Sequence, residues 1–153
     1  MVGLSLSQAQ ALLALGIDKV REYPGKSACI SVCDPHGFLV SFVRMDGAPV
    51  RSIQLAQQKA YTSVRLGTST EAFLARLRRE DIPIGYFCDA LLTALPGGAV
   101  LLDAQGAMLG GIGVSGLTPA EDQAIADALV CDRAGLAATP PSMGDPRGQR
   151  VSR

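Results

Sequence analysis

The stretch Gly110-Gly111-Ile112-Gly113-Val114-Ser115-Gly116 is the part of the sequence around which we expect the fold to be organised. It has the character of an apolar strand, and repeated glycine inside a strand indicates that either another backbone or a ligand comes close. Directly after it, Thr118 and Glu121 have the spacing of a capping box, and Pro119 falls on the first helical position. The free N–H groups of such a helix start can receive an anion, although a tight strand-to-helix junction without a ligand explains the same pattern.

A hairpin is predicted to contain this strand. Residues 99–102 and 107–114 are apolar and flank the turn sequence Asp103-Ala104-Gln105-Gly106. The helix that begins at Thr118 is expected to continue to about residue 133. The second half of the chain therefore predicts a hairpin that leads into a helix.

The first half of the chain predicts a similar arrangement. A helix is expected over residues 4–22, followed by a hairpin over 28–33 and 38–44 around the turn Asp34-Pro35-His36-Gly37. Because the strands arrive in adjacent pairs, the fold class is α+β with a mainly antiparallel sheet. If the two hairpins pair within one sheet, the bends that follow them come together and can form a pocket.

Two helices are predicted between the hairpins. The first covers residues 50–66, has small residues on its buried stripe and ends at Gly67, a natural C-terminal cap. Thr68 and Glu71 have the spacing of a second capping box, which predicts a short helix after it. The small residues on the first helix indicate close packing on the sheet.

Two segments lack clear apolar periodicity. Residues 82–95 contain proline and glycine, and we expect an irregular stretch followed by a short strand or turn over 87–92. The C-terminal residues are rich in proline, glycine, serine and arginine, which predicts a disordered tail over 139–153. The remaining residues, 1–138, are of the size of a single domain.

Composition excludes several classes of partner. The 14 Lys and Arg residues balance the 14 Asp and Glu residues, and this zero net charge argues against nucleic acid or an anionic membrane as partner. No apolar run approaches the roughly 20 residues that a membrane span needs. The first residues lack the pattern of a signal peptide, which predicts a cytoplasmic location. Cys29 and Cys33 would lie roughly 13 Å apart on one strand, so we expect buried, reduced thiols.

Three polar residues in the first half could carry chemistry. Arg44 ends a strand, Asp46 lies in the following bend, and Lys59 lies in the middle of a helix. A positioned Arg and Lys can hold a carboxylate or stabilise an enolate, while Asp46 moves a proton. The alternative is a surface pair between Arg44 and Asp46 and a lysine that extends from its helix into solvent.

His36 is the one histidine of the chain. In a Pro-His-Gly turn it is either a solvent-facing turn residue or a ligand for a metal or haem iron. The sequence has no zinc-type ligand spacing and no P-loop, and its glycines do not match the dinucleotide fingerprint. Neither Ser115 nor Cys88 has a histidine nearby in sequence, which disfavours a nucleophile–histidine catalyst.

Four motifs in register resemble the GlcG/HbpS family of haem-binding and haem-degrading-like domains. They are Arg44-Met45-Asp46-Gly47-Ala48, Lys59-Ala60, Leu95-Pro96-Gly97-Gly98 and the glycine-rich strand up to Gly116, with Asp122 fitting as well. The same domain resembles the C-terminal part of PduO-type corrinoid adenosyltransferases. The resemblance runs from about residue 6 to residue 137.

This resemblance implies a three-layer α/β/α fold with a five-stranded antiparallel sheet, similar to profilin-like domains. It also implies that the segment over 87–92 completes the sheet and that the chain forms a homo-oligomer, a dimer or larger. The implied ligand is haem or another tetrapyrrole, with His36 or Met45 on the iron and Arg44, Arg51 or Lys59 near the propionates.

The sequence is compatible with three functions. The first is a small-ligand-binding protein with haem as the candidate cofactor. The second is a cofactor-independent enzyme of the isomerase or lyase type, with Lys59, Arg44 and Asp46 as catalytic residues acting on a small carboxylated substrate. The third is an assembly role. The expected ligand-binding residues are Arg44, Met45, Lys59, Gly111, Gly113, Ser115 and Gly116.

Overall fold

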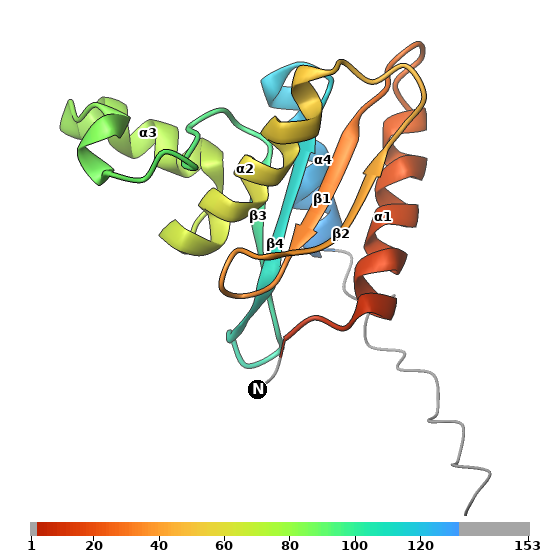
Figure 1. Cartoon of the computed structure of the whole chain (residues 1–153), viewed down its shortest axis with the longest axis horizontal. Coiled ribbons are helices and arrows are strands. Elements are labelled where there is room, and N and C mark those ends of the chain that lie inside the picture. Colours follow the sequence, from red (N-terminus) through yellow and green to blue (C-terminus); the bar gives the residue numbers. More distant parts are fainter. Residues whose placement is uncertain (1–2, 132–153) are drawn as a thin grey trace, which may run out of the picture.

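A four-stranded antiparallel sheet forms the centre of the molecule (Figure 1). The computed structural model describes residues 3–131. The strands lie in the order β2-β1-β4-β3, with bounds β1 Cys29–Cys33, β2 Leu39–Arg44, β3 Gly98–Leu102 and β4 Met108–Ser115. Each predicted hairpin is present, and pairing of β1 with β4 joins the two hairpins into one sheet.

Helices cover both faces of the sheet. Helices α1, Leu6–Arg21, and α4, Pro119–Cys131, pack together on one face, and α2, Arg51–Leu66, packs on the other. Helix α3, Thr70–Glu80, follows α2 and stands away from the sheet on the same side (Figure 1). The predicted α+β class and three-layer arrangement are therefore present.

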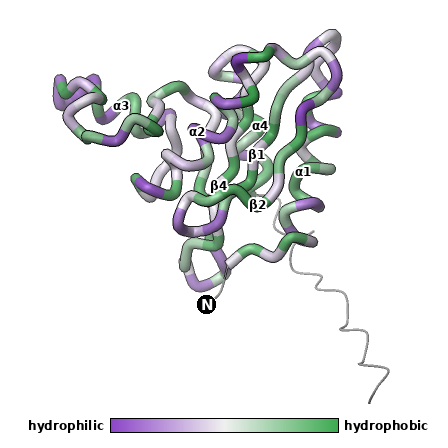
Figure 2. Tube along the Cα trace, in the orientation of Figure 1, coloured by the Kyte–Doolittle hydropathy of each residue, from purple (hydrophilic) through white to green (hydrophobic). Residues whose placement is uncertain are grey.

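The main apolar core lies between the sheet and helices α1 and α4. Because side chains alternate along a strand, every second residue of β1 and β4 points to this side. Figure 2 shows hydrophobic residues along the strands at the centre of the molecule. The buried residues of this core include Leu12, Val20, Ile30, Val32, Ile112, Val114, Ile125 and Leu129.

The glycines of β4 allow α2 to lie very close to the sheet. A Cβ added to Gly113 would collide with the backbone oxygen of Ala56, and one added to Gly111 would lie 2.7 Å from the backbone oxygen of Ala60. The two alternatives for this glycine-rich strand were another backbone or a ligand. At Gly111 and Gly113 the group that comes close is the backbone of α2.

The helix ends follow the capping signals in most places. Thr118 and Glu121 form the predicted capping box, since each backbone N–H donates to the other's side chain at 3.2 Å. Gly67 ends α2 in the left-handed conformation. The predicted cap of α3 was off by one residue, because the hydroxyl of Ser69 accepts the hydrogen bond from the Ala72 N–H at 3.1 Å.

The expectation of a fifth strand was wrong for the described residues. The segment after α3 forms a 3-10 helix over Ile84–Phe87 and then turns. Pro83 before this helix is itself extended, but Cys88 ends the helix in the left-handed conformation, which interrupts an extended backbone. The ring of Phe87 packs edge-on against Phe73 of α3 at 5.2 Å between centroids, which holds the segment on α3 and away from the sheet edge.

Several expectations lie outside the described residues, among them the end of the last helix near residue 133, the end of the domain at residue 138 and the tail over 139–153. Within residues 3–131, no helix has the length and apolar character needed to cross a membrane. Cys29 and Cys33 are buried and free, as expected.

Replacing Gly113 with alanine tests the close approach of α2 to β4. The new methyl group meets the backbone of Ala56 rather than a flexible side chain, so the helix has to move. We expect Gly113→Ala to lower the free energy of unfolding, measured in urea, by about 3 kcal/mol. Gly85→Ala is the control, because nothing lies within 4 Å of the added Cβ there. Equal midpoints for both variants would contradict this packing.

Candidate functional site

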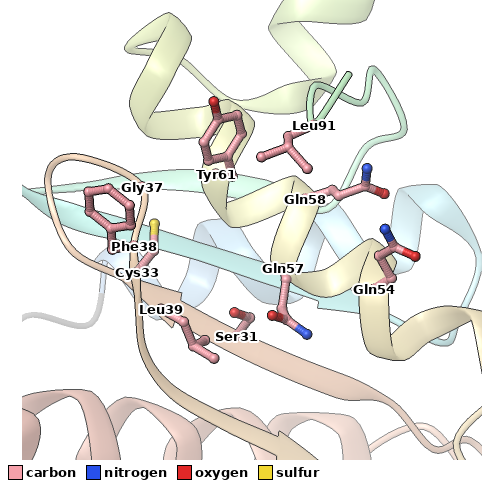
Figure 3. A pocket seen from close by; sticks show the side chains of 10 residues that line it. All are labelled: Ser31, Cys33, Gly37, Phe38, Leu39, Gln54, Gln57, Gln58, Tyr61 and Leu91. Carbon is pink, nitrogen blue, oxygen red and sulfur yellow. The ribbon is translucent and has the colours of Figure 1, made fainter. Parts of the chain in front are cut away.

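A cavity of about 230 Å³ lies between the β1–β2 hairpin and helix α2 (Figure 3). We call it the hairpin–helix cavity. It is formed on the α2 side of the sheet, next to the edge strand β2. Its lining residues are Ser31, Cys33, Gly37, Phe38, Leu39, Gln54, Gln57, Gln58, Tyr61 and Leu91.

The cavity follows from where α2 lies on the sheet. The helix packs over β1, β4 and β3, so β2 lies beside it rather than beneath it. Strand alternation turns Ser31 and Cys33 toward α2. From the helix, Gln54, Gln58 and Tyr61 share one face by their spacing of four and three residues, and all three line the cavity.

The rim of the cavity is apolar and exposed, whereas its inner wall is buried. Phe38, Leu39 and Leu91 are 67%, 54% and 49% exposed and line the same cavity, and exposed apolar side chains that are grouped in this way indicate a binding surface. Ser31 and Cys33 on the inner wall are 1% and 2% exposed. The Ser31 hydroxyl is a buried polar atom without a hydrogen-bond partner among residues 3–131.

The lining residues are uncharged at neutral pH. Burial raises the pKa of the Cys33 thiol to about 12, so the thiol keeps its proton. The Tyr61 hydroxyl donates a 2.6 Å hydrogen bond to Asp89, which raises the pKa of the phenol. Arg65 lies over the Tyr61 ring at 5.0 Å, outside the lining. A thiol that stays protonated is a poor nucleophile, which argues against catalysis by Cys33.

Lys59 lies elsewhere, in a buried cluster between α2, β4 and the start of α4. Its side chain is fully buried, and its Nζ donates to the backbone oxygen of Val114 at 2.8 Å and to Asp122 Oδ2 at 3.1 Å. The other Asp122 oxygen accepts from the Leu117 N–H at 3.0 Å. The alternative of a lysine extending into solvent is therefore wrong, and the lysine does not line the hairpin–helix cavity.

Burial shifts both members of this ion pair toward their neutral forms. It lowers the pKa of Lys59 and raises the pKa of Asp122, because weakly polar surroundings disfavour each charge. The opposite charge of the partner counteracts both shifts. Gly97 leaves room for the lysine, since an added Cβ there would lie 2.7 Å from Nζ.

The remaining residues expected at the site are dispersed. Arg44 and Asp46 are exposed and form no ion pair with each other in the described part of the chain, so the expected surface pair is absent. Met45 packs against the core on the α1 side.

The other expected residues also have structural surroundings of their own. The Ser115 hydroxyl bonds to Ser52, 3.2 Å away, and His36 is exposed in the β1–β2 turn. Gly116 has a φ of 148°, and an added Cβ would collide with the Ser27 backbone oxygen.

The sequence analysis missed the residues that line the cavity. The polar stripe of Gln54, Gln58 and Tyr61 along α2 was the available signal. Ser31 gave none, because the sequence does not show whether the hydroxyl of a serine in a short apolar strand is buried and unpaired. No group of three or more His, Cys, Asp or Glu side chains within residues 3–131 could hold a metal ion.

Comparison with known proteins points to one family. A family model described as "Haem degrading protein HbpS-like" matches residues 4–130. No relative was found among the curated proteins.

Several solved structures share the fold. The PduOC:heme complex is 25% identical, covers 85% of this chain and 94% of its own, and has a TM-score of 0.74. A structure of HbpS is 26% identical, with 86% and 90% of the two chains covered and a TM-score of 0.76. Protein ORFY from Klebsiella pneumoniae, 24% identical, shows likeness of fold alone, at a TM-score of 0.79 over 90% of this chain and 93% of that one.

Substitution of Lys59 tests whether its charge holds the fold together. Lys59→Met leaves the Asp122 carboxylate buried without its partner, and we expect a loss of about 3–5 kcal/mol in the free energy of unfolding. The double variant Lys59→Met/Asp122→Asn should lose less than the sum of the single losses. Arg76→Met is the control, since its ion pair with Glu80 is exposed. If Lys59→Met is as stable as that control, the buried ion pair between Lys59 and Asp122 does not stabilise the fold as described.

Proposed function

As the chain belongs to the family of HbpS-like haem degrading proteins, we propose that it is a small-molecule-binding protein whose ligand occupies the hairpin–helix cavity. The observation that carries the proposal is the combination of a buried, unpaired Ser31 hydroxyl with an exposed apolar rim. An apolar pocket with a few convergent polar groups is the usual form of a small-molecule site.

Haem is the candidate ligand that the family suggests. Its support is the description of the matching family and the haem bound in the similar PduOC structure. His36 lies in the turn directly before Gly37 and Phe38, which line the cavity, and it is the candidate ligand for the iron. The apolar rim could contact the ring.

A whole haem does not fit inside the cavity. Its volume of about 230 Å³ is below the range of roughly 300–1,000 Å³ typical of sites for drug-sized ligands. Cys33 and Tyr61, which could otherwise ligate iron, keep their protons for the reasons given above. A haem would have to lie across the rim with only one edge enclosed.

The enzyme alternative has weaker support. Its catalytic residues are Lys59, Arg44 and Asp46, acting on a small carboxylated substrate. The Lys59 ammonium already has two acceptors and no exposed surface, whereas Arg44 and Asp46 are exposed. A substrate would have to displace Asp122 from the lysine. Proton transfer by these residues stays a prediction.

Assembly into a homo-oligomer also stays a prediction. It is compatible with the proposed site, because a second copy could contact the exposed residues Phe38, Leu39 and Leu91 around the rim. Such a contact would enclose more of a ligand that protrudes from the cavity.

Haem titration followed at the Soret band tests the candidate ligand. Haem held at the rim is expected to give a saturable one-to-one shift that weakens at least tenfold in His36→Ala and in Ser31→Leu, whose side chain fills the cavity. Gln105→Ala, in the exposed turn of the other hairpin, should bind like the unmodified chain. A shift that is indifferent to both site variants would contradict haem binding here, and the absence of any shift would exclude haem and leave a smaller ligand.

A further inference from the structure

The inner wall of the hairpin–helix cavity holds a hydroxyl that the fold does not use. Ser31 Oγ has no hydrogen-bond partner among residues 3–131. Other buried serines on this side of the sheet are paired: Ser63 donates to the Ala60 backbone oxygen at 2.7 Å, and Ser115 bonds to Ser52. Buried polar groups in folded proteins are nearly always paired. An unpaired hydroxyl at a cavity wall is therefore a group whose hydrogen bonding a ligand could complete.

Gln57 supplies a second polar group beside this hydroxyl. Its Nε2 donates to the backbone oxygen of Ile53 at 3.0 Å, which fixes the amide and leaves its oxygen as an acceptor. Figure 3 shows the Gln57 side chain reaching from α2 toward the strand that carries Ser31. A hydroxyl that can donate and accept, next to an amide oxygen that accepts, suits a ligand group with both a donor and an acceptor.

The cavity offers nothing to a charged ligand. Its lining consists of apolar, amide, hydroxyl and thiol side chains. The charged groups next to lining residues are Arg65 over the Tyr61 ring, Asp89 at the Tyr61 hydroxyl and Asp34, whose negative charge helps to raise the pKa of Cys33. All three lie outside the lining. A carboxylate placed at Ser31 would lose its hydration without gaining a cation. An uncharged polar group loses far less hydration free energy when it is buried at the same place.

The size of the cavity limits the ligand to about one ring. Its volume of about 230 Å³ exceeds the roughly 150 Å³ of an apolar cavity that binds benzene. Phe38, Leu39 and Leu91 give the outer part of the cavity an apolar wall. An aromatic ring placed there would direct a substituent toward Ser31.

We propose that the hairpin–helix cavity binds an uncharged compound of a single aromatic ring with a neutral hydrogen-bonding substituent, such as an amide, that bonds to Ser31 and Gln57. The inference rests on the proposed function, because it specifies the ligand of the same cavity. It departs from the haem candidate, whose two propionates and larger ring match neither the charge nor the size of the cavity.

Calorimetric titration of the full chain with benzamide and benzoate tests this inference. The two probes share a ring and differ in whether the substituent is a neutral amide or a carboxylate. We expect benzamide to bind and benzoate to bind at least tenfold more weakly. Ser31→Ala should weaken benzamide binding roughly tenfold, the effect of losing one well-placed hydrogen bond. It should not lower the melting temperature, since the hydroxyl has no partner in the free protein.

Ser41→Ala is the matched control. Ser41 lies on β2 opposite Val32, whose side chain belongs to the core on the α1 side, so this serine faces away from the cavity. Benzamide should bind to this variant as to the unmodified chain.

Equal binding of both probes, unaffected by Ser31→Ala, would overturn the inference and leave small-molecule binding in place. Haem binding without binding of either probe would have the same meaning. Failure of both probes and of haem would overturn the proposed function as well.

Discussion

The buried ammonium group of Lys59 is the constraint on which the arrangement of the fold depends. A lysine without exposed surface must have its charge and its hydrogen bonds met internally, and Asp122 and the Val114 carbonyl meet them. This requirement fixes the start of α4 against β4 and α2. Gly97 leaves room for the lysine, and Gly111 and Gly113 let the helix that carries it lie close to the sheet.

The same constraint determines where a ligand can bind. Because α2 is held over β1, β4 and β3, its other side and the edge strand β2 leave a cavity between them. Of the residues that suggested a site by their chemistry, Lys59 is used in the interior of the protein, whereas Arg44, Asp46 and His36 are exposed. The residues that line the cavity are uncharged, and their chemistry is recognisable only once Ser31 is seen to be buried and unpaired.

Local sequence signals predicted most elements of the fold. Asp34 and Asp103 each accept two backbone N–H groups within their own turns, so the two Asp-x-x-Gly sequences specify both hairpins. The glycine-rich strand was also recognised as a place of close approach. What could not be predicted depends on distant residues. Lys59 pairs with a residue 63 positions away, and the 3-10 helix over Ile84–Phe87 is held by a ring contact with α3.

The most direct test of the account is to map where a small ligand binds, by two-dimensional NMR of the ¹⁵N-labelled chain titrated with benzamide. The account predicts that the amide signals of Ser31, Gly37 and Leu91, at the hairpin–helix cavity, shift saturably, while those of Gly97 and Gly98, beside Lys59, do not. Shifts centred on Gly97 and Gly98 with an unchanged cavity would contradict it and would return the binding site to the lysine cluster.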